Sequence, residues 1–534
     1  MGYIFDFVAV DYFLLASFIL VSLYWFSTST FGYWKQRGIP YIKPIPIFGN
    51  IRLQVLGVKP VVLLNQDLYT ELRQHGFGGF FQMKTPTLMV TDPELVERVM
   101  VKDFQHFYDR GISVDAHRDP LTSNLFFLEG RAWRDLRHKL TPTFSTGKLK
   151  AMFDQIGACS DKLVRYIEEG RHEPIDVCKV SGDFAFDVIA SCAFGLQFDS
   201  DDPINAELRR IISSLTSPSA KALLKQMVFI FSPALANMIG LKVFPKTMDD
   251  LLINLVRSTI KYREDNNVKR SDFLQLMLNV RKKEESGRVD RMEEEAQPED
   301  DVINQMTHAK VGDDGGTENK EEVLMSDAVM AANSLVFFLA GSDTVSNTIS
   351  YVLLCLAQNP EVQDKVHAEI TALTQQHGGK WSYQAVREML YLEQVIQETV
   401  RLYPLVFQLL RVCTKSYRIP GTDVIIDKGT QVTVPVYSIH HDPNNYASPE
   451  KFDPERFEGN NFKPSGKYLP FGDGPRICIA MRFGVLEVKV VLARLISQFS
   501  VKLNNKTKTP LEFTNSPNSL IAKDGIWIDF VKRL

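Results

Sequence analysis

Cysteine is scarce in this chain and never clustered. Six cysteines occur in 534 residues, and none of them forms a C-x-x-C pair. Secreted domains held by disulfides need a denser pattern, and zinc ribbons need paired spacings. Both classes are therefore excluded, and the isolated thiols indicate a reducing compartment. A cysteine with a chemical role in this protein would have to act alone.

A strong net charge is also absent. The chain has 61 Lys and Arg against 64 Asp and Glu, a net charge of −3, so its charge does not point to nucleic acid as a partner. No G-x-G-x-x-G sequence follows a predicted strand, which excludes a nicotinamide or flavin site of that kind. The apolar share of 45% and the charged share of 23% are typical of a folded globular protein. They exclude whole-chain disorder and a multi-span transporter.

Charged residues are missing altogether from Tyr12–Trp34. This run includes about 20 strongly apolar residues, or ~30 Å of helix, enough to cross a bilayer. The chain starts with acidic residues, and the first basic ones, Lys35 and Arg37, follow the run, which places the rest of the chain in the cytosol. A cleaved signal peptide would have a basic start and a shorter apolar core. We therefore expect residues 1–34 to form an uncleaved membrane anchor, with aromatic residues at the membrane interface: Tyr24, Trp25, Tyr33 and Trp34.

Three prolines, Pro40, Pro44 and Pro46, follow the anchor. They cannot continue a helix, so residues 35–50 are predicted to be a stiff, extended linker before a single globular body over residues 51–534. Within that body, residues 284–322 hold 14 acidic and 4 basic residues, a local charge of −10 that leaves +7 for the remainder. We interpret this segment as a solvated, mobile loop; an acidic docking site is the alternative.

Most of the body is predicted to be helical. Val323–Gln358 contains no proline, and its middle is apolar on all sides, which predicts one long buried helix. Phe81–Val90 and Val424–Val436 carry the β-branched residues and turn signals of strands. Amphipathic spacing predicts further helices over Pro93–Val101, Lys148–Glu169, Asp183–Phe194, Met248–Glu264 and Ser271–Lys283.

The most informative stretch is Phe471–Ala480, which reads Phe-Gly-Asp-Gly-Pro-Arg-Ile-Cys-Ile-Ala. Two glycines and a proline predict an irregular loop, and the apolar run Phe483–Phe499 predicts a helix directly after it. Cys478 is thus expected at a helix N-terminus, where N–H groups and the helix dipole favour a thiolate. A lone cysteine is more often a small buried hydrophobe. The glycine-rich loop instead favours a charged sulfur that is held against a flat ligand.

This stretch resembles the signature F-x-x-G-x-R-x-C-x-G of the cytochrome P-450 superfamily of haem-thiolate monooxygenases. Phe471, Gly474, Arg476 and Cys478 match the signature, whereas Ala480 stands where glycine is commonest. The resemblance extends in the expected order from about Pro44 to Asp529. It implies a mainly α fold with a small β region and a long central helix across a buried haem b, after one N-terminal transmembrane helix. It also implies that Cys478 is the axial iron ligand, that Arg476 pairs with a haem propionate, and that Phe471 and Gly472 lie at the haem.

Glu398 and Arg401 lie three residues apart on one predicted helical face. Alone, such a pair is an ordinary surface ion pair. The family resemblance implies that Arg456 joins them in a buried network that supports the cysteine loop.

Ala340-Gly341-Ser342-Asp343-Thr344 places a glycine and polar residues inside the long apolar helix. A packing glycine beside a threonine bonded back to its own helix is one reading. The resemblance favours another, a local opening beside dioxygen at Ala340, with Thr344 as its hydrogen-bond partner and Asp343 relaying protons.

Further residues match the family's haem and substrate positions. Trp133 and Arg137 fall on one helical face, and the resemblance assigns both to the haem propionates, together with Arg110 and Arg411. The substrate pocket is expected to be apolar. Its candidate residues, each of which has core packing as the alternative, are Phe126, Phe127, Val336, Phe337 and Val406.

The chain has no nicotinamide site of its own, so its electrons must come from another protein. The resemblance implies NADPH–cytochrome reductase, with cytochrome b5 as a second donor, on the endoplasmic reticulum membrane. A basic patch of Arg134, His138, Lys139, Lys148 and Lys150 would suit an acidic donor, with a solvated helix as the alternative.

Three stretches narrow the resemblance to arthropod microsomal members that oxidise plant toxins and insecticides: Phe107–Gly111, Phe126–Gly130 and Lys139–Phe144. We therefore expect insertion of one oxygen atom from O2 into an apolar small molecule, in detoxification. The alternatives are hydroxylation of an endogenous lipid or hormone, a reductase-independent isomerase or peroxygenase, and a non-catalytic haem sensor.

Overall fold

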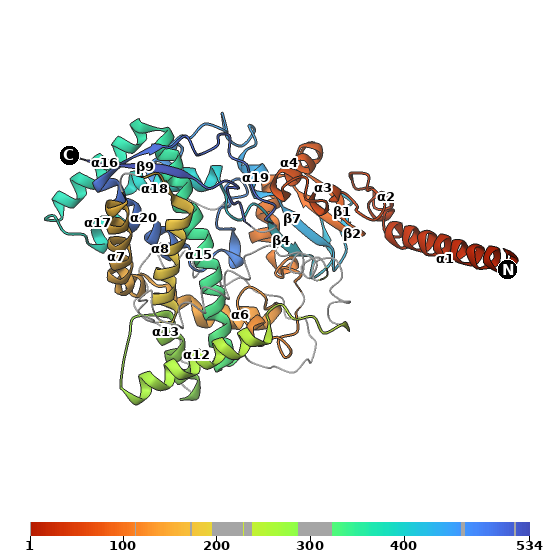
Figure 1. Cartoon of the computed structure of the whole chain (residues 1–534), viewed down its shortest axis with the longest axis horizontal. Helices are drawn as coiled ribbons and strands as arrows, with labels where there is room; N and C mark the ends of the chain where they lie inside the picture. Colours follow the sequence, from red (N-terminus) through yellow and green to blue (C-terminus); the bar gives the residue numbers. More distant parts are fainter. Residues whose placement is uncertain are drawn as a thin grey trace.

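One uninterrupted helix, α15 (Asp327–Gln358), runs through the middle of the molecule in this computed structural model (Figure 1). The structure describes residues 2–112, 114–170, 173–194, 228, 238–286, 323–460, 465–516 and 519–533. Ser326 begins α15 by accepting the Val329 N–H on its hydroxyl. Most side chains of α15 are buried, as its apolar sequence predicts.

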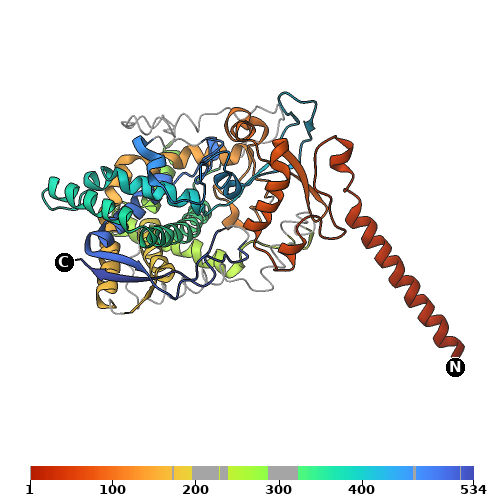
Figure 2. The same ribbon diagram turned by 90° about the horizontal axis from the view of Figure 1, so that it is seen from above.

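Helices pack around α15 to form the main core (Figures 1 and 2). The most extensive packing is with α8 (Val177–Phe194), and α20 (Met481–Gln498) and α18 (Leu390–Leu402) also contact α15. The other longer helices are α4 (Val61–Leu72), α6 (Gly130–Leu140), α7 (Thr146–Glu169), α12 (Lys246–Asp265), α13 (Phe273–Glu285) and α16 (Pro360–Gln376). Short helices are α2 (Tyr33–Gln36), α3 (Arg52–Val55), α5 (Pro93–Glu97), α17 (Tyr383–Arg387) and α19 (Val436–His440).

A four-stranded sheet lies on the side of the body from which the N-terminal helix leaves (Figure 1). Its order is β1 (Phe77–Gln82), β2 (Thr85–Val90), β7 (Gln431–Val434) and β4 (Leu409–Val412), and only the β2–β7 pair is parallel. A second sheet joins β3 (Ile175–Asp176), β9 (Trp527–Lys532) and β8 (Phe499–Leu503), and a third pairs β5 (Tyr417–Arg418) with β6 (Ile425–Ile426). The mainly α fold with a small β region is therefore confirmed.

Both predicted strands are longer than the strands in the structure, because each prediction spans a turn. Phe81–Val90 contains a turn, because Met83 adopts a left-handed φ of 54° and the chain doubles back as the β1–β2 hairpin. Met-Lys lacks the Asn or Gly that usually marks such a turn, so the pattern concealed it. Val424–Val436 is likewise divided into β6 and β7 by a turn at Gly429, where φ is 90°. Pro93–Val101 is divided too, into α5 and a π-helical turn over Arg98–Lys102.

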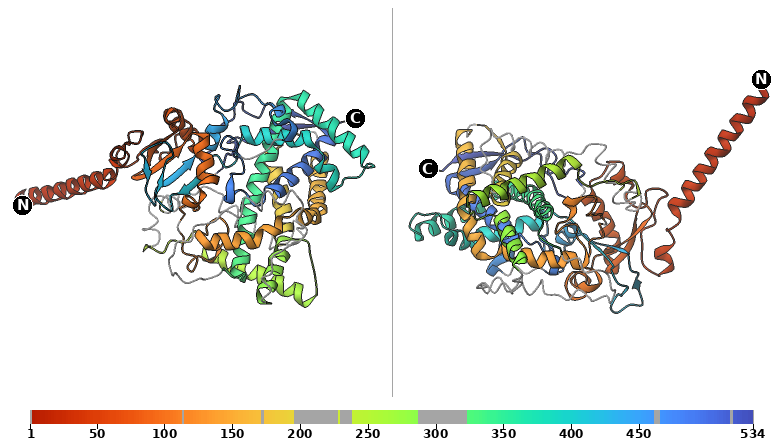
Figure 3. Two further views of the ribbon diagram at one scale, coloured as in Figure 1. Left: turned by 180° about the vertical axis from the view of Figure 1, so that it is seen from behind. Right: turned by 90° about the horizontal axis from the view of Figure 1, so that it is seen from below.

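The N-terminal helix α1 (Gly2–Thr28) extends away from the body in every view (Figures 2 and 3). Of the described residues, two helical windows are long and apolar enough to cross a membrane: Asp11–Thr28 is 6% buried, and Asp327–Gln358, which is the core helix α15, is 56% buried. The expected membrane-interface role fits Tyr24 and Trp25, which are exposed on α1. It does not fit Trp34, which is fully buried and donates its indole N–H to the Phe80 carbonyl at 3.2 Å.

The predicted linker over residues 35–50 belongs to the folded body instead. Ile39 is buried, and Asn50 accepts the Phe81 N–H at 2.7 Å on its side-chain oxygen. Tyr41 and Gly49 form bridges to the edge of β1. The prolines do keep this segment from forming a helix, but extended chain beside a sheet edge can pair with it rather than stand free. Of the acidic segment, residues 287–322 lie outside the described residues.

Candidate active site

The loop Phe471–Ala480 is built so that its backbone can approach another backbone closely. Gly472 and Gly474 have left-handed φ values of 76° and 66°. A Cβ on Gly474 would lie 2.0 Å from the Met100 carbonyl oxygen, so no other residue fits there. The Cys478 N–H donates to the Phe471 carbonyl at 2.9 Å and closes the loop. Phe471, Gly472 and Cys478 are therefore held together by one short, fixed turn.

Cys478 precedes α20 rather than beginning it. The helix starts at Met481 with Ala480 as its N-cap, two residues beyond the cysteine. Burial raises the pKa of the Cys478 thiol, while a hydrogen bond from the Ala480 N–H and the positive charges of Arg137 and Arg110 lower it. The groups that favour a thiolate are therefore one loop amide and two arginines.

Alanine fits at position 480 without strain. Ala480 has φ −96° and ψ 14°, a conformation that any L residue adopts. The glycine that is commonest at this position in the signature is therefore not required here by backbone conformation.

Four arginines converge on this loop from different parts of the chain; three of them are buried and Arg110 is half-buried. Arg110 follows a short 3-10 turn, Arg137 lies in α6, Arg411 in β4 and Arg476 in the cysteine loop. Burial lowers the pKa of Arg110 and Arg137 to about 10, of Arg411 to about 9 and of Arg476 to about 7. Mutual repulsion adds to the effect at Arg476 and Arg411. Because arginine stays protonated in proteins, these lowered pKa values mean that the site holds several positive charges where water solvates them poorly.

Two acidic residues offset only part of this positive charge. Asp109 lies 3.4 Å from the Arg476 guanidinium and accepts the Gly130 N–H at 2.8 Å. Burial, with the charge of Asp109, raises the pKa of Glu129 to about 7. Neither acid appeared among the sequence candidates, although Asp109 directly precedes Arg110. No motif marks a carboxylate that serves an arginine distant in sequence.

Buried guanidinium donors remain unmet among the described residues. Arg137 Nε and Nη2 and Arg411 Nε have no hydrogen-bond partner there. Unmet buried donors are costly, so a ligand that carries carboxylates is expected to satisfy them. A haem brings two propionates and a flat macrocycle, and its iron would meet the Cys478 sulfur. The residues present therefore fit haem.

Trp133 contributes to this cluster through Arg476. The Arg476 guanidinium carbon lies 3.8 Å from the centroid of the buried Trp133 ring, a cation–π contact. The Arg476 nitrogens also donate to the carbonyls of Tyr108 at 2.9 Å and Leu128 at 3.2 Å. Trp133 thus orients the arginine that the resemblance assigns to a propionate.

Glu398, Arg401 and Arg456 form one buried network. Glu398 and Arg401 make a bidentate pair at 2.6 and 2.8 Å and are both fully buried. Arg456 lies 3.4 Å from the same carboxylate. Arg401 also donates to the carbonyls of His440 at 2.9 Å and Pro449 at 2.8 Å. The network fastens the segment before the cysteine loop to α18.

His440 connects this network to the cysteine loop. Its Nε2 accepts the Leu469 N–H at 2.9 Å, and its Nδ1 lies 3.1 Å from the Arg401 carbonyl. Burial and the adjacent His441 and Arg401 hold the pKa of His440 well below its usual range, so the ring is neutral. No pattern in the sequence marks this residue, because the His-His-Asp-Pro run carries no chemical motif of its own.

One face of α15 is not packed. Ala340 is exposed in the middle of this otherwise buried helix, and Val336, Asp343, Thr344 and Asn347 are partly accessible at helical spacing around it. The helix remains regular here, so no break opens it. Thr344 Oγ1 donates to the Ala340 carbonyl at 2.6 Å, which is the back-bonded arrangement.

Gly341 and Asp343, two residues apart on α15, have different surroundings. A Cβ on Gly341 would lie 3.1 Å from Ile189 Cδ1, so the glycine permits close packing against α8. Burial raises the pKa of Asp343. In the described part of the chain, no ion pair or side-chain hydrogen bond holds its carboxylate.

The pocket candidates are not all brought together. Phe126 and Phe127 pack edge to face at 5.1 Å, and the Arg110 guanidinium lies 4.8 Å from the Phe126 ring. Phe337 is buried among Phe144 and Phe273, with centroids 5.4 and 5.5 Å away, and so belongs to the core. Val336 is partly accessible on the open face of α15, and Val406 is 40% exposed after α18.

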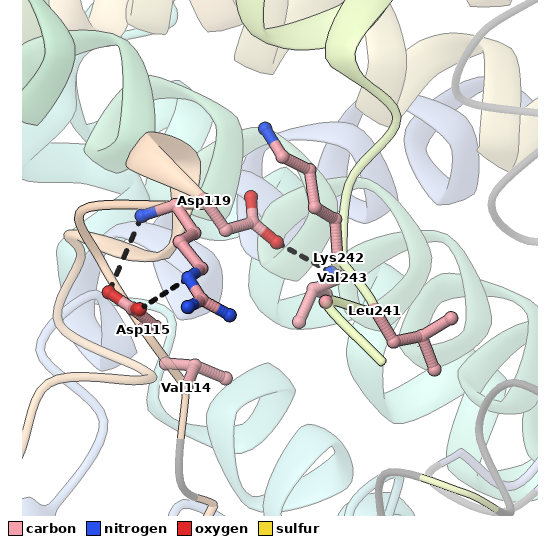
Figure 4. A pocket seen from close by; sticks show the side chains of 8 residues that line it. Val114, Asp115, Asp119, Leu241, Lys242 and Val243 are labelled. Atoms are coloured by element: carbon pink, nitrogen blue, oxygen red, sulfur yellow. Dashed lines mark hydrogen bonds and ion pairs between the residues drawn. The ribbon is translucent and has the colours of Figure 1, made fainter. Parts of the chain in front are cut away.

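A small hollow lies where the loop before Phe126 meets the chain leading into α12 (Figure 4). Asp119 reaches across it and accepts the Val243 N–H at 2.5 Å and the Phe244 N–H at 3.1 Å. The hollow is lined by both charged and apolar side chains and does not include the cysteine loop.

Comparisons with known proteins agree with this geometry. A family model described as Cytochrome P-450 matches residues 39–528. Probable cytochrome P-450 6a14 of Drosophila melanogaster is 36% identical over 527 residues, covering 96% of this chain and 98% of its own. Cytochrome P-450 6k1 of Blattella germanica is 34% identical over 526 residues, covering 98% of this chain and 97% of its own. The chain belongs to the cytochrome P-450 family and is a haem-dependent monooxygenase.

Proposed function

We propose that the chain holds haem b on Cys478 and oxidises apolar small molecules, with electrons from a separate NADPH–cytochrome reductase. The observation that carries the proposal is the group of four arginines around the cysteine loop, two of which, Arg137 and Arg411, have buried donors without a partner among the described residues. Arg137 and Arg411 would bind the propionates with these donors, and Arg476, stacked on Trp133, would fix their direction. When bound, a haem with thiolate ligation supplies O2 activation, by which one oxygen atom enters the substrate and the other leaves as water.

Asp343 and Thr344 are proposed to deliver protons at the open face of α15. The raised pKa of Asp343 brings its carboxyl closer to holding a proton near neutral pH. The Thr344 hydroxyl donates its hydrogen to the Ala340 carbonyl, so its Oγ1 can accept a hydrogen bond from a proton donor. The proton path would run from the Asp343 carboxyl to the Thr344 Oγ1 and from there to the reacting oxygen.

The reductase is proposed to dock over α6 and the start of α7. Arg134 in α6 and Lys150 in α7 are exposed. Lys139 is a weaker candidate, because its Nζ lies 2.6 Å from the Glu284 carboxylate and donates to the Val323 carbonyl. The helix α1 supports anchoring in a membrane, which we propose is the endoplasmic reticulum, with cytochrome b5 as a second donor.

The substrate class is proposed to be lipophilic toxins such as plant compounds and insecticides. Phe126 and Phe127 offer apolar surface beside Arg110. Hydroxylation of an endogenous lipid or hormone would use the same surface and is the second candidate.

The test is the absorption spectrum of the reduced protein with carbon monoxide. We expect the red-shifted Soret band of thiolate ligation in the full chain and its loss in Cys478→Ala. A folded chain without this band, or a Cys478→Ala variant that keeps it, would overturn the proposal. Product formation that needs both NADPH and reductase separates a monooxygenase from a peroxygenase or isomerase.

A further inference from the structure

We propose that Asn333 is a specificity-determining positioning residue, which fixes the loop that presents Phe126 and Phe127. The inference rests on the proposed function, because it assigns that loop to the substrate side of the haem. Asn333 lies in α15 about three turns before Thr344. It is fully buried although it is polar.

Each polar atom of the Asn333 amide has a partner. The Oδ1 accepts the Leu125 N–H at 3.3 Å, and the Nδ2 donates to the carbonyls of Ser123 at 3.4 Å and Val329 at 2.8 Å. The first two partners belong to the loop, and the third belongs to the helix itself. An apolar side chain could not replace these bonds, so the amide joins α15 to the loop at a single register.

Asn124, in the same loop, fixes the backbone of the two phenylalanines. It is 1% exposed, and its Oδ1 accepts the N–H groups of Phe126 at 2.9 Å and Phe127 at 3.2 Å. Its Nδ2 donates to the Leu121 carbonyl at 2.7 Å. The turn is thus closed by hydrogen bonds to one side chain.

The loop has further attachments on either side of Asn333. At its start, Asp119 accepts the N–H groups of Val243 and Phe244. At its end, Arg110 donates to the Phe126 carbonyl at 3.0 Å. Phe127 lies edge to face with Phe244, with centroids 6.2 Å apart. Asn333 therefore adds side-chain hydrogen bonds between the helix that carries Thr344 and the turn that carries the aromatic side chains.

This arrangement predicts a selective effect on large ligands. A small haem ligand occupies only the space at the iron, beside Ala340 and Thr344. A ligand with an aromatic extension would also meet the Phe126–Phe127 turn. Loss of the Asn333 amide should therefore change the affinity for the second ligand and leave the first unchanged.

The experiment uses the full-length, haem-loaded protein and two azole probes that bind haem iron, imidazole and 4-phenylimidazole. Their dissociation constants are measured by optical titration in the parent, Asn333→Leu, Asn333→Ser and Ser334→Ala. Ser334 is the matched control, since it is the next residue of α15, is equally buried, and its Oγ has no hydrogen-bond partner among the described residues. Hydrogen exchange of residues 119–128 is measured in the same proteins without haem.

We expect the 4-phenylimidazole dissociation constant to change by at least about fivefold in both Asn333 variants, and that of imidazole by less than about twofold. Loop exchange should become faster in these variants and stay unchanged in Ser334→Ala. Unchanged 4-phenylimidazole binding in Asn333 variants with a normal carbon monoxide band would overturn the inference alone, as would equal effects in Ser334→Ala. A parent that takes up no haem would overturn the proposed function and, with it, this inference.

Discussion

His440 and Leu469 are joined by a buried hydrogen bond, in which the His440 Nε2 accepts the Leu469 N–H at 2.9 Å. Leu469 lies just before the loop that ends at Cys478. The other ring nitrogen of His440 contacts the carbonyl of Arg401, a member of the Glu398 network. The cysteine loop is thereby fastened to α18 through one imidazole ring.

His440→Ala should weaken this attachment. It would leave the buried Leu469 N–H without a partner, which costs about 1–3 kcal/mol. The thiolate-type carbon monoxide band should disappear at a lower temperature than in the parent. The control is His441→Ala: this ring is also buried, and it bonds locally, to the Tyr437 carbonyl of α19 at 2.8 Å. Equal losses in the two variants would contradict a special role for His440.

Acid should destabilise the fold through these same histidines. Burial lowers the pKa of His440 well below its usual range and that of His441 to about 4, whereas an unfolded histidine titrates near ~6.5. Below ~pH 6.5 the unfolded state binds more protons, so this contribution to stability is complete above ~pH 6.5 and is lost as the pH falls toward ~4. The melting temperature of the parent should therefore fall more steeply from about pH 7 to about pH 5 than that of His440→Gln. Equal slopes of melting temperature against pH in the two proteins would refute the role of His440 in acid destabilisation.

The sequence predicted the elements that carry a strong pattern. The apolar run of α15 and the loop around Cys478 were located correctly, because continuous hydrophobicity and glycine-rich turns are local signals. Contacts between distant segments had no such signal: Asp109 with Arg476, His440 with Leu469, and Trp34 beneath β1. Trp34 shows the limit well, since an aromatic residue after an apolar run looks the same whether a membrane or a sheet covers it.

The burial of Trp34 predicts where the N-terminus can be cut. Removal of residues 1–28 should leave a folded, haem-binding protein, because side chains of the described part of α1 are mostly exposed. Removal of residues 1–38 also deletes Trp34 and should cost about 3–5 kcal/mol, the typical loss for a large buried aromatic side chain. Chemical denaturation of both truncated proteins measures the difference. Trp34→Ala in the longer one should reproduce most of the loss.

Gly474 and Ala480, two of the small residues of the cysteine loop, should differ in whether they tolerate the gain or loss of a methyl group. Gly474→Ala would place a Cβ 2.0 Å from the Met100 carbonyl at a left-handed φ, so haem incorporation should fall severely. Ala480→Gly should change stability by less than about 1 kcal/mol, because Ala480 already has an ordinary conformation. Haem content per folded protein distinguishes them. Normal loading of Gly474→Ala would show that the loop can move away from Met100.

Thr344→Val should separate electron consumption from product formation. Without the hydroxyl, the proposed proton path is broken, and product per NADPH should fall at least about tenfold. Thr348→Val is the matched control, because its hydroxyl donates to the Thr344 carbonyl one turn away and plays no part in the proposed path. Coupling as efficient as in the parent would remove Thr344 from the mechanism.

Contacts with the β1–β2 turn join the end of α1 and the residues after it to the body. Lys84, in that turn, lies over the Phe26 ring at 3.5 Å, and its carbonyl accepts the Thr30 hydroxyl. If α1 is the membrane anchor proposed above, these contacts would limit the body to few orientations on a lipid surface. When two proteins meet on one bilayer, each encounter normally costs rotational freedom. Here the body would lose that freedom once, when it folds against α1. The tilt of α1 would in this way influence how often a collision with a membrane-bound electron donor is productive.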